Sequence, residues 1–133
     1  MGAASPPTGL TDTDILIDVS RGFPDAVAFL SQLHATSGVC TSIISAMELV
    51  AGCRNKTELT NVQAFLGKLA LLPVDGSISQ TAYTLMESYF LSHGLVIPDA
   101  LIAATALEHG LTLYTKNTRH FQMTSSLLIV RPY

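Results

Sequence analysis

Helical and strand-like segments alternate along almost the whole of this 133-residue chain. In the helical segments apolar residues recur every three or four positions, and short apolar runs bounded by Gly, Pro or Ser separate them. We predict helices at 15–20, 24–35, 43–53, 57–68, 78–92 and 98–109. We predict strands at 10–13, 39–42, 70–74, 111–115 and 127–130. This alternation favours an α/β fold with a mostly parallel sheet, because parallel strands need a crossover, usually a helix, between them.

The length and composition of the chain indicate one domain with a large apolar core. Residues 1–9 (MGAASPPTG) are small, Pro-containing and aperiodic, so we expect a flexible leader followed by a single domain over residues 10–133. Hydrophobic residues make up 48% of the chain, more than one modest core readily hides. The seven Lys and Arg residues are scattered and the net charge is −3, so any polyanion site must be small and local.

Cysteine usage and hydropathy narrow the choice of compartment. Cys40 and Cys53 stand apart, without a CxxC motif or a His spacing that suggests zinc, which is typical of free thiols in a reducing compartment. No apolar run approaches the ~18 residues that span a bilayer, and no signal peptide is recognisable. We therefore expect a cytoplasmic protein that does not bind membranes.

Acidic and polar residues occur at points that a parallel sheet brings to one edge. The ligand sites of such sheets lie beyond the carboxyl ends of the strands. Asp12 lies at the end of the first predicted strand, and Asn117 and His120 follow the fourth. Asp99 lies in the first turn of a predicted helix, and Glu48 lies in mid-helix between apolar neighbours.

Each acid has an ordinary structural explanation when it is taken alone. Asp99 suits the helix dipole, and Glu48 suits a helix surface. Asp14 is expected to cap the first helix, and Asp18, one turn later, is expected to face solvent. Together, carboxylates from distant segments form the oxygen-rich site that Mg²⁺ or Mn²⁺ prefers, and without a cation they would repel one another. Such a cation can polarise a phosphodiester and generate hydroxide for in-line attack.

The resemblance to a known family rests on four segments, which read DTDILIDVSRG (12–22), SIISAMELVAGC (42–53), IPDALIAATALEHGLTLYTKN (97–117) and RHF (119–121). They are similar to the PIN-domain family, and above all to the VapC-type toxins of bacterial toxin–antitoxin pairs. This resemblance implies a three-layer α/β/α sandwich and a Mg²⁺- or Mn²⁺-dependent ribonuclease that leaves 5′-phosphate and 3′-hydroxyl ends. It also implies a homodimer, and a cognate antitoxin that inhibits by covering the acidic pocket.

The resemblance assigns roles residue by residue. The acids that match the family's catalytic, metal-binding carboxylates are Asp12, Glu48 and Asp99. The polar residues that match positions beside the pocket are Asp14, Thr115 and Asn117. Two nearby cations are candidates for contact with an RNA phosphate, although such residues more often only aid solubility: Lys116 and Arg119.

One position departs from the family's pattern. The family has a fourth acid in an N-x-x-D-F setting, where this chain reads NTRHF over residues 117–121. His120 is therefore a candidate metal ligand of a different kind, because imidazole binds Mn²⁺ but is a poor ligand for Mg²⁺.

Two alternatives to a ribonuclease remain open from the sequence. With His120 in the fourth acidic position, the chain is also compatible with a catalytically weak PIN-like protein that acts mainly by binding its antitoxin. Asp-x-Asp after a strand also opens the haloacid-dehalogenase-like phosphatases. That class expects a later paired-acid motif, and no Asp-Asp pair occurs in this chain.

Overall fold

The computed structural model describes residues 9–133, which contain one five-stranded sheet. Its strands lie in the order β3-β2-β1-β4-β5, and every pairing is parallel. The strands are Gly9–Thr11 (β1), Cys40–Ser42 (β2), Ala70–Leu72 (β3), Thr112–Tyr114 (β4) and Ile129–Val130 (β5). The helices are Thr13–Ser20 (α1), Pro24–Thr36 (α2), Ile43–Ala51 (α3), Lys56–Leu66 (α4), Gly76–His93 (α5), Ile97–His109 (α6) and the 3-10 helix Thr118–His120 (η1). The predicted parallel sheet is therefore confirmed.

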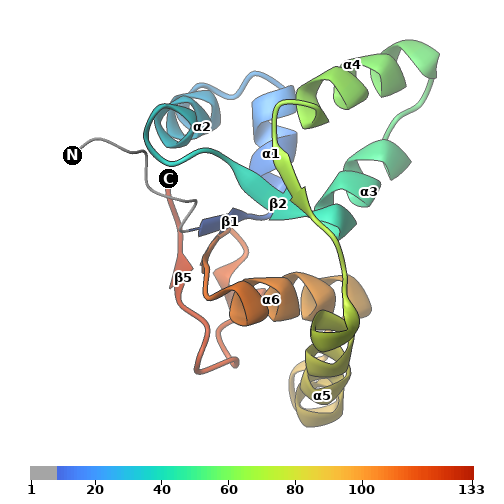
Figure 1. Cartoon of the computed structure of the whole chain (residues 1–133), viewed down its shortest axis with the longest axis vertical. Helices are drawn as coiled ribbons and strands as arrows, with labels where there is room; N and C mark the ends of the chain where they lie inside the picture. Colours follow the sequence, from blue (N-terminus) through green and yellow to red (C-terminus); the bar gives the residue numbers. More distant parts are fainter. Residues whose placement is uncertain (1–8) are drawn as a thin grey trace.

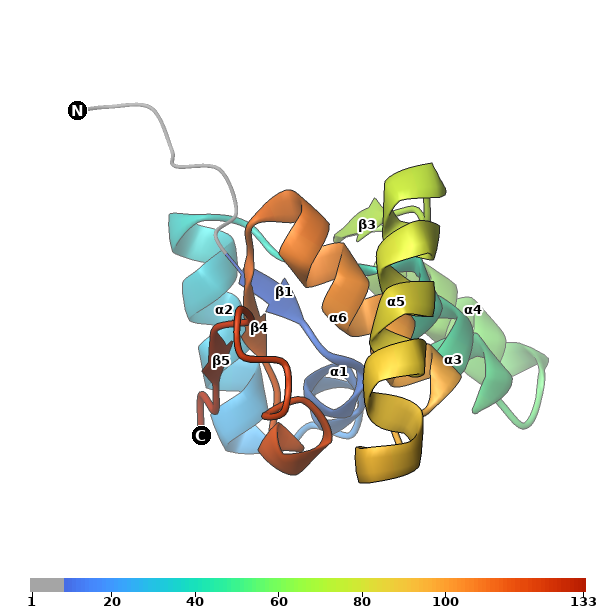
Figure 2. The ribbon, with the colours of Figure 1, turned by 90° about the horizontal axis from the view of Figure 1, so that it is seen from below.

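Helices cover both faces of the sheet (Figure 1). On one face α5 and α6 pack against the strands, around buried residues such as Leu10, Ile102 and Leu113. On the other face lie α1, α2, α3 and α4, which contribute residues such as Leu16 and Leu49 to a second core. Figure 2 shows α5 and α6 packed side by side, with α6 between α5 and the central strand β1 in this view. The three-layer α/β/α sandwich expected from the resemblance is confirmed.

The central strand β1 begins one residue earlier than predicted. Gly9, which the sequence placed in the leader, pairs with Thr112 of β4. A Cβ atom at Gly9 would collide with the ring of Tyr114, which packs edge-on against Phe29 with 5.1 Å between ring centroids. Glycine thus lets a neighbouring aromatic ring lie on the strand backbone. The rest of the predicted leader, residues 1–8, lies outside the described part of the chain.

Polar caps and glycines set the helix ends that matter for the site. Asp75 caps α5 by accepting a hydrogen bond from the third amide after it, so this helix begins two residues before the predicted start at residue 78. Gly94 and Gly110 end α5 and α6 with φ of 67° and 63°, a conformation that glycine adopts at little cost. Because α5 ends so sharply, the chain turns into α6 with Asp99 in its first turn.

Candidate active site

The parallel register of β1 and β4 places an aspartate and a threonine side by side at the carboxyl edge of the sheet. Thr11 pairs with Tyr114, and the next residues along the two segments are Asp12 and Thr115. The Asp12 amide donates a hydrogen bond to the Tyr114 carbonyl (2.9 Å). The Thr115 hydroxyl donates to Oδ2 of Asp12 (2.8 Å). The site therefore begins where ligand sites of parallel sheets are expected.

Asp12 is the most buried of the predicted acids, with only 4% of its surface exposed. Its Oδ1 accepts a hydrogen bond from the Thr13 amide (2.8 Å). Burial, followed by the neighbouring charge of Asp14, raises the pKa of Asp12 from 3.8 to about 7, against the opposite effect of the Thr115 hydrogen bond. The ionised form of this carboxyl group is therefore destabilised unless a cation compensates its charge.

Asp12, and not Asp14, caps helix α1, so the predicted cap is wrong by two residues. The helix begins at Thr13, which places Asp14 inside its first turn. There Oδ1 of Asp14 accepts a hydrogen bond from the Ile15 amide (2.8 Å), and Oδ2 accepts one from the Lys116 amide (2.8 Å). Asp14 thus joins α1 to the segment that follows β4, beside Asp12.

Glu48 comes from α3 and is exposed. The hydroxyl oxygen of Thr13 lies 2.6 Å from Oε1 of Glu48 and 2.8 Å from Oγ of Ser45, which is fully buried. Thr13, the residue after Asp12, therefore links α1 to α3 through its contacts with Ser45 and Glu48. The sequence reasoning missed Thr13 and Ser45, and the only signal was the place of Thr13 between two aspartates.

Asp99 and His120 form a pair between α6 and η1. Oδ2 of Asp99 lies 3.1 Å from Nδ1 of His120, and the two side chains keep 19% and 57% of their surface exposed. Burial raises the pKa of Asp99, the His120 ring lowers it, and the charges of Glu48 and Asp14 raise it further. His120, which stands in the family's fourth acidic position, therefore contacts Asp99, the third acid.

The donor set suits a hard divalent cation in its chemistry. Carboxylate oxygens are the ligands that Mg²⁺ and Mn²⁺ prefer, and their charges act on one another here, since Asp14 and Asp99 raise the pKa of Asp12. Within residues 9–133, however, no group of three or more Asp, Glu, His or Cys side chains is arranged so that it could hold a metal ion. Asp12, Asp14, Glu48 and Asp99 each contact a polar group of the protein itself.

A sequence profile of the PIN domain matches residues 10–125. The chain belongs to the PIN-domain family. Ribonuclease VapC19 of Mycobacterium tuberculosis is 36% identical to this PIN domain over 120 residues, which cover 89% of this chain and 95% of VapC19. Ribonuclease VapC10 of the same organism is 34% identical over 119 residues, which cover 89% of each chain. The predicted likeness to VapC-type proteins is therefore confirmed.

The PIN domain also matches a solved structure described as a toxin–antitoxin complex from Klebsiella pneumoniae. The TM-score is 0.76 at 29% sequence identity, and the match covers 94% of this chain and 98% of that chain. The family and the fold together exclude the haloacid-dehalogenase-like phosphatase that the Asp-x-Asp pattern left open.

The two cations predicted to contact RNA phosphate have different surroundings in this PIN domain. Arg119 lies on η1 and is exposed, whereas the ammonium group of Lys116 pairs with Asp18. Asp18 was predicted to face solvent, which is wrong because its side chain keeps only 19% of its surface exposed in this pair. Asn117 is exposed, and its amide donates to the hydroxyl oxygen of Thr115 (3.0 Å).

Proposed function

We propose that this PIN domain is a metal-dependent endoribonuclease, the toxin of a type II toxin–antitoxin pair, and that it hydrolyses RNA phosphodiester bonds. The observation that carries the proposal is the carboxyl group of Asp12, which is buried at the carboxyl edge of the central strand with its pKa raised to about 7. Strongly perturbed acids of this kind cluster at functional sites. The relatives named Ribonuclease VapC19 and Ribonuclease VapC10 support the reaction class.

The proposed metal ligands are Asp12, Glu48 and Asp99. When bound there, Mg²⁺ or Mn²⁺ would polarise the scissile phosphodiester and make a water molecule a better nucleophile at neutral pH. The chain's own residues hold two of these acids in place. Thr115 holds one oxygen of Asp12, and Thr13 holds Glu48 against α1. Such outer contacts orient ligands before the metal arrives.

His120 would bring a nitrogen donor to the place where the family has a carboxylate, and its contact with Asp99 supports a place in the site. Neutral imidazole adds no negative charge, so we propose that the site favours Mn²⁺ over Mg²⁺. The same substitution also supports the second candidate function, that of a catalytically weak protein that acts mainly by binding its antitoxin.

The purified chain should cleave RNA when Mn²⁺ is present and stop when a chelator removes the metal. Asp99→Asn should weaken Mn²⁺ binding by roughly tenfold or more, because it removes a ligand charge, and Asp25→Asn, an exposed acid on α2, is the matched control. His120→Asp should raise the rate in Mg²⁺ relative to the rate in Mn²⁺. Calorimetric titration and gel-resolved cleavage measure these effects.

Two outcomes of these measurements would contradict the proposal. If the wild-type chain cleaves RNA in neither metal, antitoxin binding becomes the better account of its function. Equal Mn²⁺ affinity in the wild-type chain and in Asp99→Asn would remove Asp99 from the proposed metal site.

We also propose that the antitoxin binds in a groove of about 750 Å³ that is lined by residues of α1, α3 and α4 and of the segments that follow α1 and α3. Apolar side chains such as Ile17, Leu49 and Phe65 line it, and Arg21 and Glu48 lie in its wall. Glu48 belongs both to the wall of this groove and to the proposed metal site, so a segment bound in the groove would lie beside that site. The description of the matching Klebsiella pneumoniae structure as a toxin–antitoxin complex supports a partner of this kind.

A homodimer is proposed because large apolar side chains remain exposed where α5 ends and α6 begins. Leu91 is 95% exposed, Ile97 64% and Phe90 53%. Sedimentation of the chain alone should report a dimer, and hydrogen exchange in α3 and α4 should slow when antitoxin is added. A monomer would contradict the proposed homodimer, and unchanged exchange would contradict the proposed antitoxin groove.

The compartment is proposed from the two cysteines. Cys40 and Cys53 carry free thiols, which supports action in the reducing cytoplasm. Among the helices of residues 9–133, none combines the length and the hydropathy needed to cross a membrane.

A further inference from the structure

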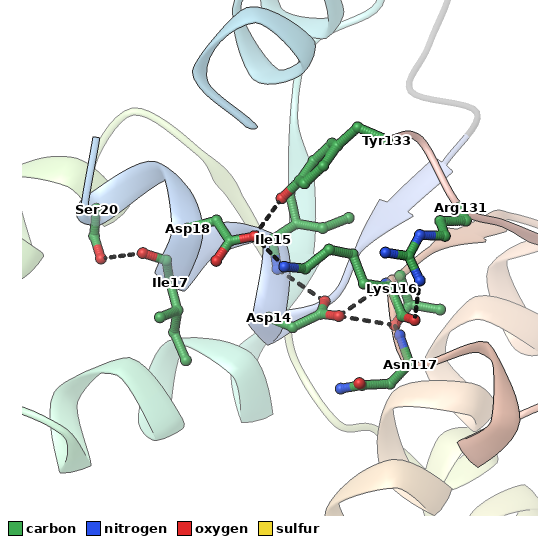
Figure 3. Close-up of polar contacts among 10 residues, drawn as sticks. Asp14, Ile15, Ile17, Asp18, Ser20, Lys116, Asn117, Arg131 and Tyr133 are labelled. Atoms are coloured by element: carbon green, nitrogen blue, oxygen red, sulfur yellow. Dashed lines mark hydrogen bonds and ion pairs between the residues drawn. The ribbon is translucent and has the colours of Figure 1, made fainter. Parts of the chain in front are cut away.

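Lys116, which follows Thr115 at the end of β4, is held by residues from distant parts of the chain (Figure 3). Its ammonium group pairs with Asp18 of α1, and its carbonyl accepts a hydrogen bond from Nη1 of Arg131 (3.3 Å). The hydroxyl of Tyr133 donates to Oδ2 of Asp18 (2.8 Å), the oxygen that also faces the Lys116 ammonium. The group of residues that we call the Lys116 clasp consists of Asp18, Phe23, Lys116, Arg131 and Tyr133.

Two aromatic rings shield the ion pair of the clasp. The Lys116 ammonium lies 5.8 Å from the centroid of the Phe23 ring and 5.6 Å from that of Tyr133. The side chains of Lys116 and Asp18 keep only 29% and 19% of their surface exposed, and the bond from Lys116 lowers the pKa of Asp18. A shielded ion pair with cation–π contacts is stronger than an exposed pair. The clasp is therefore built around a partly buried ion pair and not around a fully exposed one.

The clasp is attached to the short segment that supports the acidic site. The Lys116 amide donates to Oδ2 of Asp14 (2.8 Å). One residue earlier, the Thr115 hydroxyl donates to Oδ2 of Asp12 (2.8 Å), and one residue later the Asn117 amide donates to the Thr115 hydroxyl oxygen (3.0 Å). Because three consecutive residues carry these bonds, a small displacement of Lys116 moves the Thr115 hydroxyl relative to Asp12.

We propose that the Lys116 clasp is a positioning device, in which Asp18 and Tyr133 fix Lys116 so that Thr115 keeps its hydrogen bond to Asp12. The inference rests on the proposed function for its kinetic consequence, because the positioned groups are those of the proposed ribonuclease site. In this proposal Lys116 acts on the site through its backbone, which carries the neighbouring Thr115. The positive charge of Lys116 is then used inside the protein, on Asp18, and not on an RNA phosphate.

Two substitutions loosen the clasp without touching the acids of the site. Asp18→Asn removes the charge that faces Lys116 and keeps the shape, and Tyr133→Phe removes only the hydroxyl. Hydrogen exchange followed by NMR should show the Lys116 amide exchanging about tenfold faster in Asp18→Asn, with a smaller increase in Tyr133→Phe. In RNA cleavage, kcat should fall by about three- to tenfold while KM stays unchanged, since the geometry of the acids is altered and RNA binding is not.

Two references show whether the effect is specific to the clasp. Thr81→Val removes an exposed hydrogen bond of similar length, from the Thr81 hydroxyl to Glu108 (2.9 Å), which joins α5 to the last turn of α6. That variant should leave kcat and the Lys116 exchange rate unchanged. The amide of Leu113, which donates to the Leu128 carbonyl (2.8 Å) inside the sheet, serves as the reference for opening of the whole fold in every variant.

Three results would overturn the inference. One is unchanged Lys116 exchange in Asp18→Asn, and another is equal acceleration at Lys116 and Leu113, which would show only a loss of global stability. The third is a raised KM with unchanged kcat, which would assign Lys116 to RNA binding. The exchange experiment needs no RNA, so an inactive wild-type chain would defeat the proposed function while faster exchange at Lys116 alone would still support the clasp.

Discussion

Asp12→Asn is expected to stop RNA cleavage and, in the same protein, to make the fold more stable. Cleavage should fall by more than about 100-fold, because the substitution removes a proposed ligand charge and not merely an outer contact. The gain in stability follows from the pKa of Asp12, which folding raises from 3.8 to about 7. Keeping this buried group ionised therefore costs the folded state on the order of 4 kcal/mol above neutral pH. Asn keeps the capping ability and should recover roughly 1–3 kcal/mol of this cost.

The stability gain should depend on pH in a definite direction. Between the unfolded pKa of 3.8 and the folded pKa of about 7, the folded chain binds more protons at Asp12 than the unfolded chain does. The contribution of Asp12 to the free energy of unfolding therefore falls as pH rises through this window, and it falls no further above it. Asn has no such titration, so the two proteins should differ little near pH ~4 and most near pH ~8.

Urea denaturation of both proteins across this pH range measures the difference directly. Asp25→Asn, which replaces an exposed acid in the first turn of α2, serves as the control and should change stability by less than about 1 kcal/mol. A variant that is less stable than the wild-type chain near pH ~8 would contradict the assigned cost of the buried charge. A gain of the same size at every pH would contradict its origin in the ionisation of Asp12.

The layers of the fold were predictable because their signals are local. Apolar spacing within about a dozen residues separates helices from runs such as LTLYT, and alternation of the two implies crossovers and a parallel sheet. The helix caps were less predictable. In the stretch DTD of residues 12–14 either aspartate satisfies the local pattern, and the pairing of Thr11 with Tyr114 decides where β1 ends and α1 begins.

The acids of the site were predictable, whereas their partners were not. Asp99 is a charged residue among apolar neighbours and Asp12 stands at the end of a short predicted strand, but Thr13 and Ser45 are small polar residues without any periodic signal. The bond between Asp18 and Tyr133 spans 115 positions. It exists because the sheet order places β4 beside β1 and β5 beside β4, which brings the segments after all three strands to one edge of the sheet. Since strand order is not written in local spacing, such contacts follow only from the folded chain.

Metal binding to the site is expected to weaken on acidification and to release a proton. Below pH ~7 the Asp12 carboxyl group of the metal-free chain is mostly protonated, and a divalent cation binds only the ionised form. The apparent affinity for Mn²⁺ should therefore fall by about tenfold for each pH unit below 7, so that it is roughly 30-fold weaker near pH ~5.5 than near pH ~8. Above pH ~7.5 the affinity should level off, because Asp12 is then already ionised.

Calorimetric titration with Mn²⁺ tests this expectation when it is run in two buffers that differ in ionisation enthalpy. Near pH ~6 the wild-type chain should release about one proton per bound ion, and near pH ~8 close to none. Since the ring of His120 contacts Asp99, His120→Ala is the decisive control. Proton release that persists in His120→Ala and disappears in Asp12→Asn assigns the proton to Asp12. Proton release that disappears in His120→Ala and persists in Asp12→Asn would assign it to the histidine, and would show that Asp12 binds the cation without first losing a proton.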